Sequence, residues 1–268
     1  QKIQMLFEQN KGRPLLMTHA VGGWPDLDTS ESVLSAMLES GADMIEVQIP
    51  FSEPAADGPL IVSANHEALA GGVTTRKVLE MIGRVCEKRS LAGSGRLTSV
   101  LVMSYLNPIL AYGEKAFVSD ARSFGVDGLI VPDCAPDEIS LLPEIAAEVG
   151  LAFVPLIAPD TESSRIEQIC NRFCSPFVYA VLRYGVTGKS TSIDSLTEAY
   201  LSRVRSASGC AVAAGFGIRE RRQVEALGCS VDCVVAGSVF IEAMNEAASR
   251  GSGMTDAVRG MVAELVRY

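Results

Sequence analysis

The chain has 268 residues, of which 48% are hydrophobic and 21% are charged, a composition typical of globular proteins that excludes an intrinsically disordered chain. Its net charge of -9 disfavours a nucleic-acid partner, because binding to phosphate backbones needs clustered Lys and Arg side chains. No apolar run approaches the roughly 18–20 residues of a membrane span, and the N-terminal residues lack the apolar core of a signal peptide. We therefore expect a soluble, cytoplasmic protein.

Short apolar runs alternate with amphipathic segments along the whole chain. The runs predict eight strands, at 14–20, 43–49, 98–105, 127–131, 151–156, 177–182, 210–214 and 231–236. Helical patterns follow them near 28–41, 75–88, 114–123, 136–148, 162–173, 194–206, 219–227 and 254–267, and a further helix is expected near 2–10. Strands that alternate with helices, without hairpin signals between them, predict parallel strands joined by crossover helices.

Eight such units favour a closed barrel over an open sheet. We predict an α/β fold consisting of a single (β/α)8 TIM barrel domain over 1–268, with an extra N-terminal helix. Long loops are expected after the second strand (50–74) and after the sixth strand (183–193). In such barrels the loops that follow the strands carry the functional site.

The cysteines do not indicate a metal centre or a disulfide framework. The chain has seven of them, without Cys-x-x-Cys spacing, and only two histidines, His19 and His66, that could join them as ligands. Cysteines in apolar stretches are more often small buried side chains. No metal site is predicted.

Two carboxylates stand out around the second predicted strand. Alternation along this strand places Ile45, Val47 and Ile49 on one face and sends Glu46 to the other face, where a core residue is usual. Partial burial would raise the pKa of Glu46 and suit it to acid–base catalysis, but a Glu paired with Lys or Arg is an equally good interpretation. Asp57 follows in a loop restricted by two prolines and a glycine, where an Asx-turn role is the alternative.

Three glycine-bearing segments follow the last three predicted strands. They are Gly185–Gly188, Gly215–Ile218 and Ala236–Ser238. Barrels frequently bind phosphate with the loops after the seventh and eighth strands and the N-terminus of a short helix, because bare amides there donate to an anion. The joint placement of these segments therefore predicts a phosphate site, and residues 239–244 read as the short helix.

Two aromatic side chains and one histidine lie at strand ends. Tyr105 and Tyr179 could line a pocket, or they could fill the barrel with their hydroxyl groups satisfied by backbone carbonyls. His19 could act in catalysis, although a lone histidine at such a position is more often a packed, hydrogen-bonded residue.

Several motifs, in their order along the chain, resemble the α-subunit family of tryptophan synthase. The resemblance covers essentially the whole length and rests on Glu46–Pro54 (EVQIPFSEP) with Ala56–Pro59 (ADGP), Tyr105–Pro108 (YLNP), Gly125–Asp133 (GVDGLIVPD), Gly185–Gly188 (GVTG), Gly215–Ile218 (GFGI) and Gly237–Ser238. It implies a (β/α)8 barrel that cleaves indole-3-glycerol phosphate, a small-molecule phosphate substrate, into indole and glyceraldehyde 3-phosphate.

The resemblance also implies partners, cofactors and residue roles. An α2β2 complex with a β-subunit is expected; pyridoxal phosphate belongs to that β-subunit, and this chain needs no cofactor. Glu46 would transfer protons, Asp57 would bind the indole nitrogen and Tyr179 would lie beside the glycerol chain. The implied substrate- and phosphate-binding residues are Ile61, Tyr105, Thr187, Gly188, Phe216, Gly217, Gly237 and Ser238.

The chain departs from the family pattern near this site. Gln48 stands where the strand usually has Gly, Glu53 replaces Asp, Leu106 replaces an aromatic residue, and Gly22–Pro25 (GGWP) replaces Ala-Gly-Asp-Pro. An alternative is therefore a catalytically weakened subunit that binds and regulates a β-subunit. A third interpretation is another barrel enzyme that acts on a sugar phosphate, since a fold does not fix a function.

Overall fold

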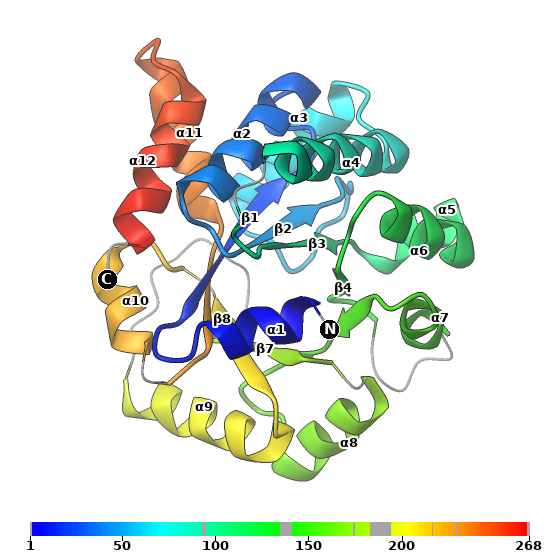
Figure 1. Ribbon diagram of the computed structural model, residues 1–268, viewed down its shortest axis with the longest axis vertical. Helices are drawn as coiled ribbons and strands as arrows, with labels where there is room; N and C mark the ends of the chain where they lie inside the picture. The colour runs from blue at the N-terminus through cyan, green and yellow to red at the C-terminus, as the bar shows by residue number, and fades with distance from the viewer. Residues whose placement is uncertain are drawn as a thin grey trace.

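Parallel strands form a closed barrel at the centre of the computed structural model, and helices surround it (Figure 1). The structure describes residues 2–92, 95–134, 141–173, 175–182, 194–215, 217–228 and 230–266. The strands are β1 (Leu15–Val21), β2 (Met44–Gln48), β3 (Ser99–Met103), β4 (Gly128–Ile130), β5 (Ala152–Val154), β6 (Leu156–Ile157), β7 (Phe177–Val181), β8 (Ala211–Gly215) and β9 (Cys233–Ala236). Their spatial order is β5-β4-β3-β2-β1-β9-β8-β7-β6.

The two ends of this sheet, β5 and β6, are one predicted strand divided at Pro155. Proline has no N–H group and cannot donate to a strand ladder, so regular pairing is interrupted there. The segment before Pro155 pairs with β4 and the segment after it pairs with β7, while the Pro155 carbonyl accepts a bond from the amide of Tyr179 at 2.9 Å. The divided strand thus closes the barrel, and the predicted eightfold architecture is confirmed.

Helices connect the strands and cover the outside of the barrel (Figure 1). They are α1 (Lys2–Gln9), α2 (Leu27–Ser40), α3 (Pro59–Ala70), α4 (Thr75–Ala92), α5 (Leu106–Tyr112), α6 (Glu114–Ser123), α7 (Leu142–Glu148), α8 (Ser163–Phe173), α9 (Ser195–Ser208), α10 (Arg221–Leu227), α11 (Ser238–Ser249) and α12 (Met254–Val266). None of these helices is long and apolar enough to cross a membrane.

The sequence did not predict two of these helices. Within the expected loop 50–74, residues 59–70 form α3, which begins with Pro59 at its first position, where the missing N–H group costs nothing. Helix α5 follows β3, which ends at Met103 and not at the expected residue 105. The segment 183–193, also expected to be a loop, lies outside the described residues.

Strand side chains divide between two cores, as the alternation predicted. Ile45, Val47 and Ile49 pack outward against the helices, whereas Met44 lies inside the barrel. Helix α1 covers the amino-terminal end of the barrel, because its Ile3 and Leu6 belong to the inner cluster. The site therefore has only the opposite, carboxyl end available.

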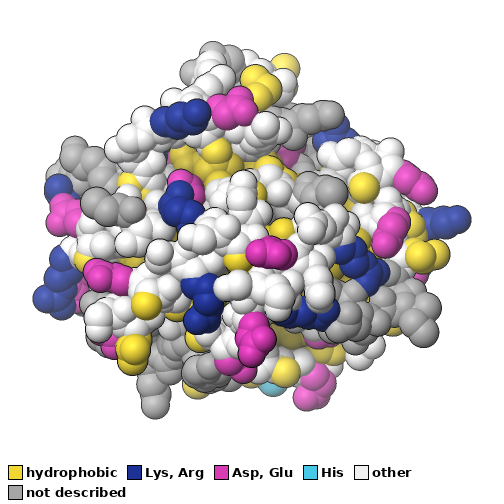
Figure 2. Space-filling view, turned by 90° about the horizontal axis from the view of Figure 1, so that it is seen from below, with side chains coloured by type: hydrophobic (Ala, Val, Ile, Leu, Met, Phe, Trp, Pro, Cys, Tyr) yellow, Lys and Arg dark blue, Asp and Glu magenta, His cyan; other side chains and the backbone are white. Residues whose placement is uncertain are grey.

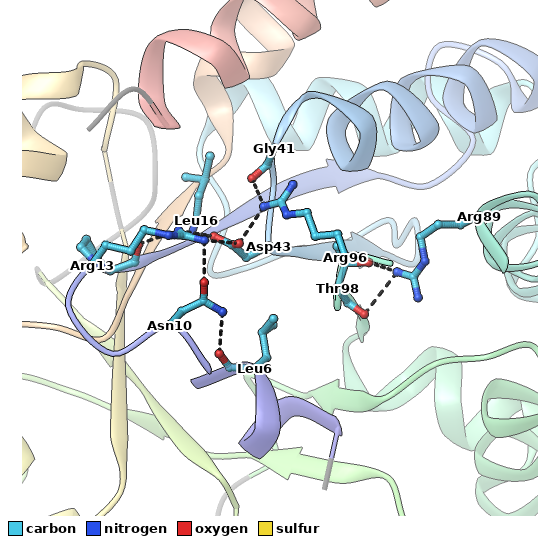
Figure 3. A network of polar contacts seen from close by, with 10 residues as sticks. Leu6, Asn10, Arg13, Leu16, Gly41, Asp43, Arg89, Arg96 and Thr98 are labelled. Atoms are coloured by element: carbon cyan, nitrogen blue, oxygen red, sulfur yellow. Dashed lines mark hydrogen bonds and ion pairs between the residues drawn. The ribbon is translucent and has the colours of Figure 1, made fainter. Parts of the chain in front are cut away.

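A polar network fixes the amino-terminal end of the barrel (Figure 3). Asp43, which precedes β2 and is 1% exposed, accepts two bonds from the Arg13 guanidinium at 2.7 and 2.8 Å and one from Arg96 at 2.7 Å. The amide of Leu16 also donates to it at 2.9 Å. Burial alone would raise the pKa of Asp43, but the bonds from Arg13 and Leu16 and the charge of Arg13 lower it, so the carboxyl group is ionised.

Charged side chains on the outside are mixed in sign. Figure 2 shows Lys and Arg interspersed with Asp and Glu on the face seen from below, with no gathering of positive charge there.

Candidate active site

A cavity lies at the carboxyl end of the barrel strands. Its lining comes from nearly every described strand or the segment after it: His19, Glu46, Ala56, Asp57, Ile61, Met103, Ile130, Pro132, Leu156, Tyr179, Gly217, Val235, Gly237 and Ser238. Barrel enzymes carry their sites at this end. Of the predicted site residues, the structure brings together Glu46, Asp57, Ile61, Tyr179, Gly217, Gly237 and Ser238 around this one cavity.

Glu46 faces the cavity from an inward-pointing position on β2. Its side chain is 5% exposed, and within the described residues no Lys or Arg pairs with it. Burial raises the pKa of Glu46, a positive charge on His19 would lower it, and the negative charge of Asp57 raises it further. Burial and the charge of Asp57 thus favour the protonated form of Glu46, which an ion pair would oppose.

Asp57 lies in the loop before α3, and hydrogen bonds hold its carboxylate. Its Oδ2 accepts from Nε2 of Gln48 at 2.7 Å and from the hydroxyl of Tyr105 at 3.0 Å. Tyr105 in turn accepts a bond from the amide of Ala56 at 3.0 Å, so the tyrosine connects the loop to the end of β3. Tyr105 thus contacts Asp57 and is not among the residues that line the cavity.

The two carboxylates have different surroundings. The pKa of Asp57 is raised as well, chiefly by burial, but a positive charge on His19 would lower it and the bonds from Gln48 and Tyr105 lower it. Glu46 has only His19 to lower its pKa, and the charge of Asp57 works against it. Environments that separate two acids in this way let one hold a proton while the other stays ionised.

Tyr179 points into the cavity from β7, and Gly215 on β8 makes room for it. A Cβ added at Gly215 would lie 2.9 Å from the Tyr179 hydroxyl and 2.5 Å from Cβ of Val235. Only glycine therefore fits between these side chains. Burial raises the pKa of Tyr179 well above its ordinary value, so the hydroxyl keeps its proton and can donate a hydrogen bond.

The opposite side of the cavity is formed by backbone. Gly217 has a φ of 75°, a conformation that side chains rarely adopt, and Gly237 and Ser238 begin α11 without a side-chain cap. The first amides of this helix therefore have no side-chain partner, and the helix dipole favours a negative charge beside them. This arrangement can hold an anion such as a phosphate.

Three predicted residues, Thr187, Gly188 and Phe216, lie outside the described residues. The apolar walls of the cavity were not predicted: they are Met103, Ile130, Pro132, Leu156 and Val235. Most of these are inward-facing residues near the carboxyl ends of their strands, and that position in each strand is the signal that could have identified them.

The residues that depart from the family pattern have defined places. Gln48 is completely buried, and its amide links Asp57 to His19. Trp24 is 5% exposed, and its indole N–H donates to Glu67 on α3 at 2.7 Å. Glu53 is exposed in the loop before Asp57. The tryptophan thus attaches α3, which carries Ile61, to the loop after β1.

These features define the class of protein: a (β/α)8-barrel enzyme with two buried, unequal carboxylates at the carboxyl end of its strands. Comparisons with known proteins give the family. The profile of the family described as tryptophan synthase alpha chain matches residues 6–266. The tryptophan synthase alpha chain of Gluconacetobacter diazotrophicus is 42% identical over 243 residues, covering 90% of this chain and 86% of the relative.

Solved structures agree with this match. A tryptophan synthase structure from Mycobacterium tuberculosis superposes with a TM-score of 0.85 at 33% identity, covering 97% of this chain and 95% of the other. The alpha chain from Legionella pneumophila gives a TM-score of 0.86 at 25% identity, covering 98% and 95%. The chain belongs to the tryptophan synthase alpha chain family, and its activity is that of a carbon–carbon lyase, the α reaction of tryptophan biosynthesis.

Proposed function

We propose that this chain cleaves indole-3-glycerol phosphate with Glu46 as the proton-transferring acid and base and Asp57 as the partner of the indole nitrogen. The observation that carries the proposal is the pair of buried carboxylates in one cavity; among the described residues, hydrogen-bond donors hold Asp57 and none is found for Glu46. Nothing in the comparisons favours the alternative of a weakened, purely regulatory subunit.

The reaction breaks the bond between C3 of the indole ring and the first carbon of the glycerol chain. Glu46 gives its proton to C3, which dearomatises the ring and places positive charge on the ring nitrogen. The ionised Asp57 stabilises that charge, which forms only along the reaction, so the interaction lowers the barrier. Glu46 then accepts the proton of the hydroxyl on that same first glycerol carbon, which becomes the aldehyde carbonyl, while the electron pair of the broken bond returns to the ring and restores indole. Indole and the aldehyde leave, and the proton count is unchanged.

The remaining site residues position the substrate in this proposal. The backbone of Gly217, Gly237 and Ser238 binds the phosphate. Thr187, Gly188 and Phe216, to which the resemblance gives substrate and phosphate contacts, lie outside the described residues. Ile61 contacts the ring, and the Tyr179 hydroxyl lies beside the glycerol chain. The chemistry needs only proton transfer, and the α reaction uses no cofactor.

A β-subunit is the proposed partner, in an α2β2 complex in which the β-subunit holds pyridoxal phosphate. Support comes from the family and from its solved relatives, which include tryptophan synthase structures from Mycobacterium tuberculosis. Co-purification of this chain with a β-subunit, and faster indole release in its presence, would test the partnership.

We propose a cytoplasmic location for the enzyme. Cys86, Cys134, Cys170, Cys210 and Cys233 are free thiols in the described structure, as is usual in reducing compartments. Cell fractionation would test this location.

Indole release by the purified chain tests the proposed function. We expect release from indole-3-glycerol phosphate, and a fall of at least about 100-fold in Glu46→Gln, since general acid–base catalysis contributes this much. Glu53→Gln makes the same chemical change at an exposed position after the same strand and should leave release unchanged. No release by the wild-type chain, alone or with a β-subunit, would refute the lyase proposal and revive the regulatory or sugar-phosphate interpretations.

A further inference from the structure

A chain of hydrogen bonds runs behind the cavity wall from β1 through β2 to the loop that carries Asp57. Nε2 of His19 and Oε1 of Gln48 are 2.9 Å apart, and Nε2 of Gln48 donates to Oδ2 of Asp57 at 2.7 Å. The Gln48 side chain is 0% exposed. Water therefore does not compete for either of its bonds, and the amide has one orientation.

The direction of each bond in this chain follows from chemistry. An ionised Asp57 only accepts hydrogen bonds, so the nitrogen of the Gln48 amide must face it and the amide oxygen must face His19. The His19 nitrogen that meets this oxygen then has to carry a hydrogen. Gln48 thus holds His19 in its Nε2–H form. The other ring nitrogen, Nδ1, is buried without a hydrogen-bond partner in the described structure.

The same bonds determine which oxygen of Asp57 meets the substrate. Gln48 and Tyr105 both donate to Oδ2, and no hydrogen bond to Oδ1 is found within the described residues. The titratable groups facing Asp57 are His19 from β1, Glu46 from β2, Tyr105 from the end of β3 and Tyr179 from β7. Gln48 is the uncharged group among them, and it supplies the shortest bond to Asp57.

We propose that Gln48 is a positioning residue for the lyase reaction: its amide holds His19 and Oδ2 of Asp57 so that Asp57 presents Oδ1, ionised, to the ring nitrogen of the substrate. This inference rests on the proposed function. The Gln48 side chain contacts Asp57 and His19 and is not among the residues that line the cavity.

Two near-isosteric variants separate support of Asp57 from simple packing. Gln48→Met fills the same space and removes both bonds. Gln48→Glu keeps an acceptor for His19 but places a second acidic group against Asp57, which makes it harder to ionise. Gln168→Met makes the same glutamine-to-methionine change at an exposed position on α8 and serves as the control.

The pH dependence of indole release is the first readout. The acid limb of kcat reports ionisation of Asp57, and we expect Gln48→Met to move it up by roughly one pH unit and Gln48→Glu to move it further. We expect kcat of Gln48→Met at neutral pH to fall about 10- to 100-fold, as when a hydrogen bond to a charged group is lost, with KM changed less than about threefold. A purely structural role would lower stability without moving the acid limb.

The tautomer of His19 is the second readout, and it does not depend on activity. The chain contains only two histidines, so 15N-histidine NMR with His66→Gln assigns the His19 signals. We expect the Nε2–H form in the wild type and a tautomer mixture in Gln48→Met. If the wild type releases indole, and Gln48→Met has the same acid limb and the same His19 tautomer as the wild type, this inference is overturned while the proposed function stands. A wild type that releases no indole would overturn the proposed function, and this inference with it.

Discussion

Replacing Asp43 by asparagine should destabilise the barrel, because it removes the charge on which two arginines converge (Figure 3). Breaking a buried ion pair costs about 3–5 kcal/mol. The Arg13 and Arg96 side chains are 31% and 36% exposed, so solvent screens part of the loss, and the amide oxygen of the introduced asparagine would still accept the bond from the Leu16 amide. We therefore expect a loss of about 2–3 kcal/mol in the free energy of unfolding.

This loss converts into a measurable shift in melting temperature. An unfolding entropy of about 2.1 cal/mol/K per residue predicts that Tm falls by roughly 4–5 °C for a chain of this length. Urea unfolding followed by the fluorescence of Trp24, the single tryptophan, and by far-UV circular dichroism gives the free energy. Coincidence of the two curves would also support the prediction of a single domain.

The pH dependence of this effect has a definite sign. The pKa of Asp43 is lower in the folded state than in the unfolded state, so its contribution is present above the unfolded value, about 3.9, and is lost as pH falls through the folded value. Glu39→Gln removes an exposed pair with Arg259 and should cost less than about 1 kcal/mol. If Asp43→Asn costs no more than Glu39→Gln at pH 7, the network does not stabilise the fold.

Three further outcomes follow from the site. The kcat of the wild type should give a bell-shaped pH profile, falling at low pH as Asp57 gains a proton and at high pH as Glu46 loses its proton; a profile without an acid limb would contradict the assigned roles. Glu46→Gln should raise the urea midpoint at pH 8 but not at pH 4. Burial raises the pKa of Glu46, so the wild-type folded state loses stability as pH rises through the folded pKa, and glutamine avoids that loss. An unchanged midpoint at pH 8 would show that Glu46 is well solvated. Gly215→Ala should lower the free energy of unfolding in urea by about 1–3 kcal/mol and reduce indole release, since the added Cβ would lie 2.5 Å from Cβ of Val235 and 2.9 Å from the Tyr179 hydroxyl. A variant as stable as the wild type would show that the strands separate easily.

Much of the fold follows from local patterns. The alternation along residues 44–49 correctly placed Ile45 and Val47 in the outer core and Glu46 inside, because side chains of a strand point to opposite faces whatever the strand pairs with. The same reasoning failed for α3 and α5. Helix α3 carries apolar residues outside its buried face as well, so its helical period is weak, and contacts with distant parts of the chain, such as the bond from Trp24 to Glu67, hold it in place.

The sequence alone determined the parallel barrel, its amino-terminal helix, and the acid and glycine residues at the ends of its strands, because hydrophobic periodicity and backbone freedom are local properties. Only the tertiary structure decided what those residues do together. Burial and hydrogen bonding depend on neighbours far apart in the chain: Gln48, His19 and Tyr105 come from three strands or strand ends to surround Asp57, whereas the described part of the chain offers Glu46 no such donors. That difference in surroundings, which no local pattern encodes, is the basis of the different roles proposed for the two carboxylates.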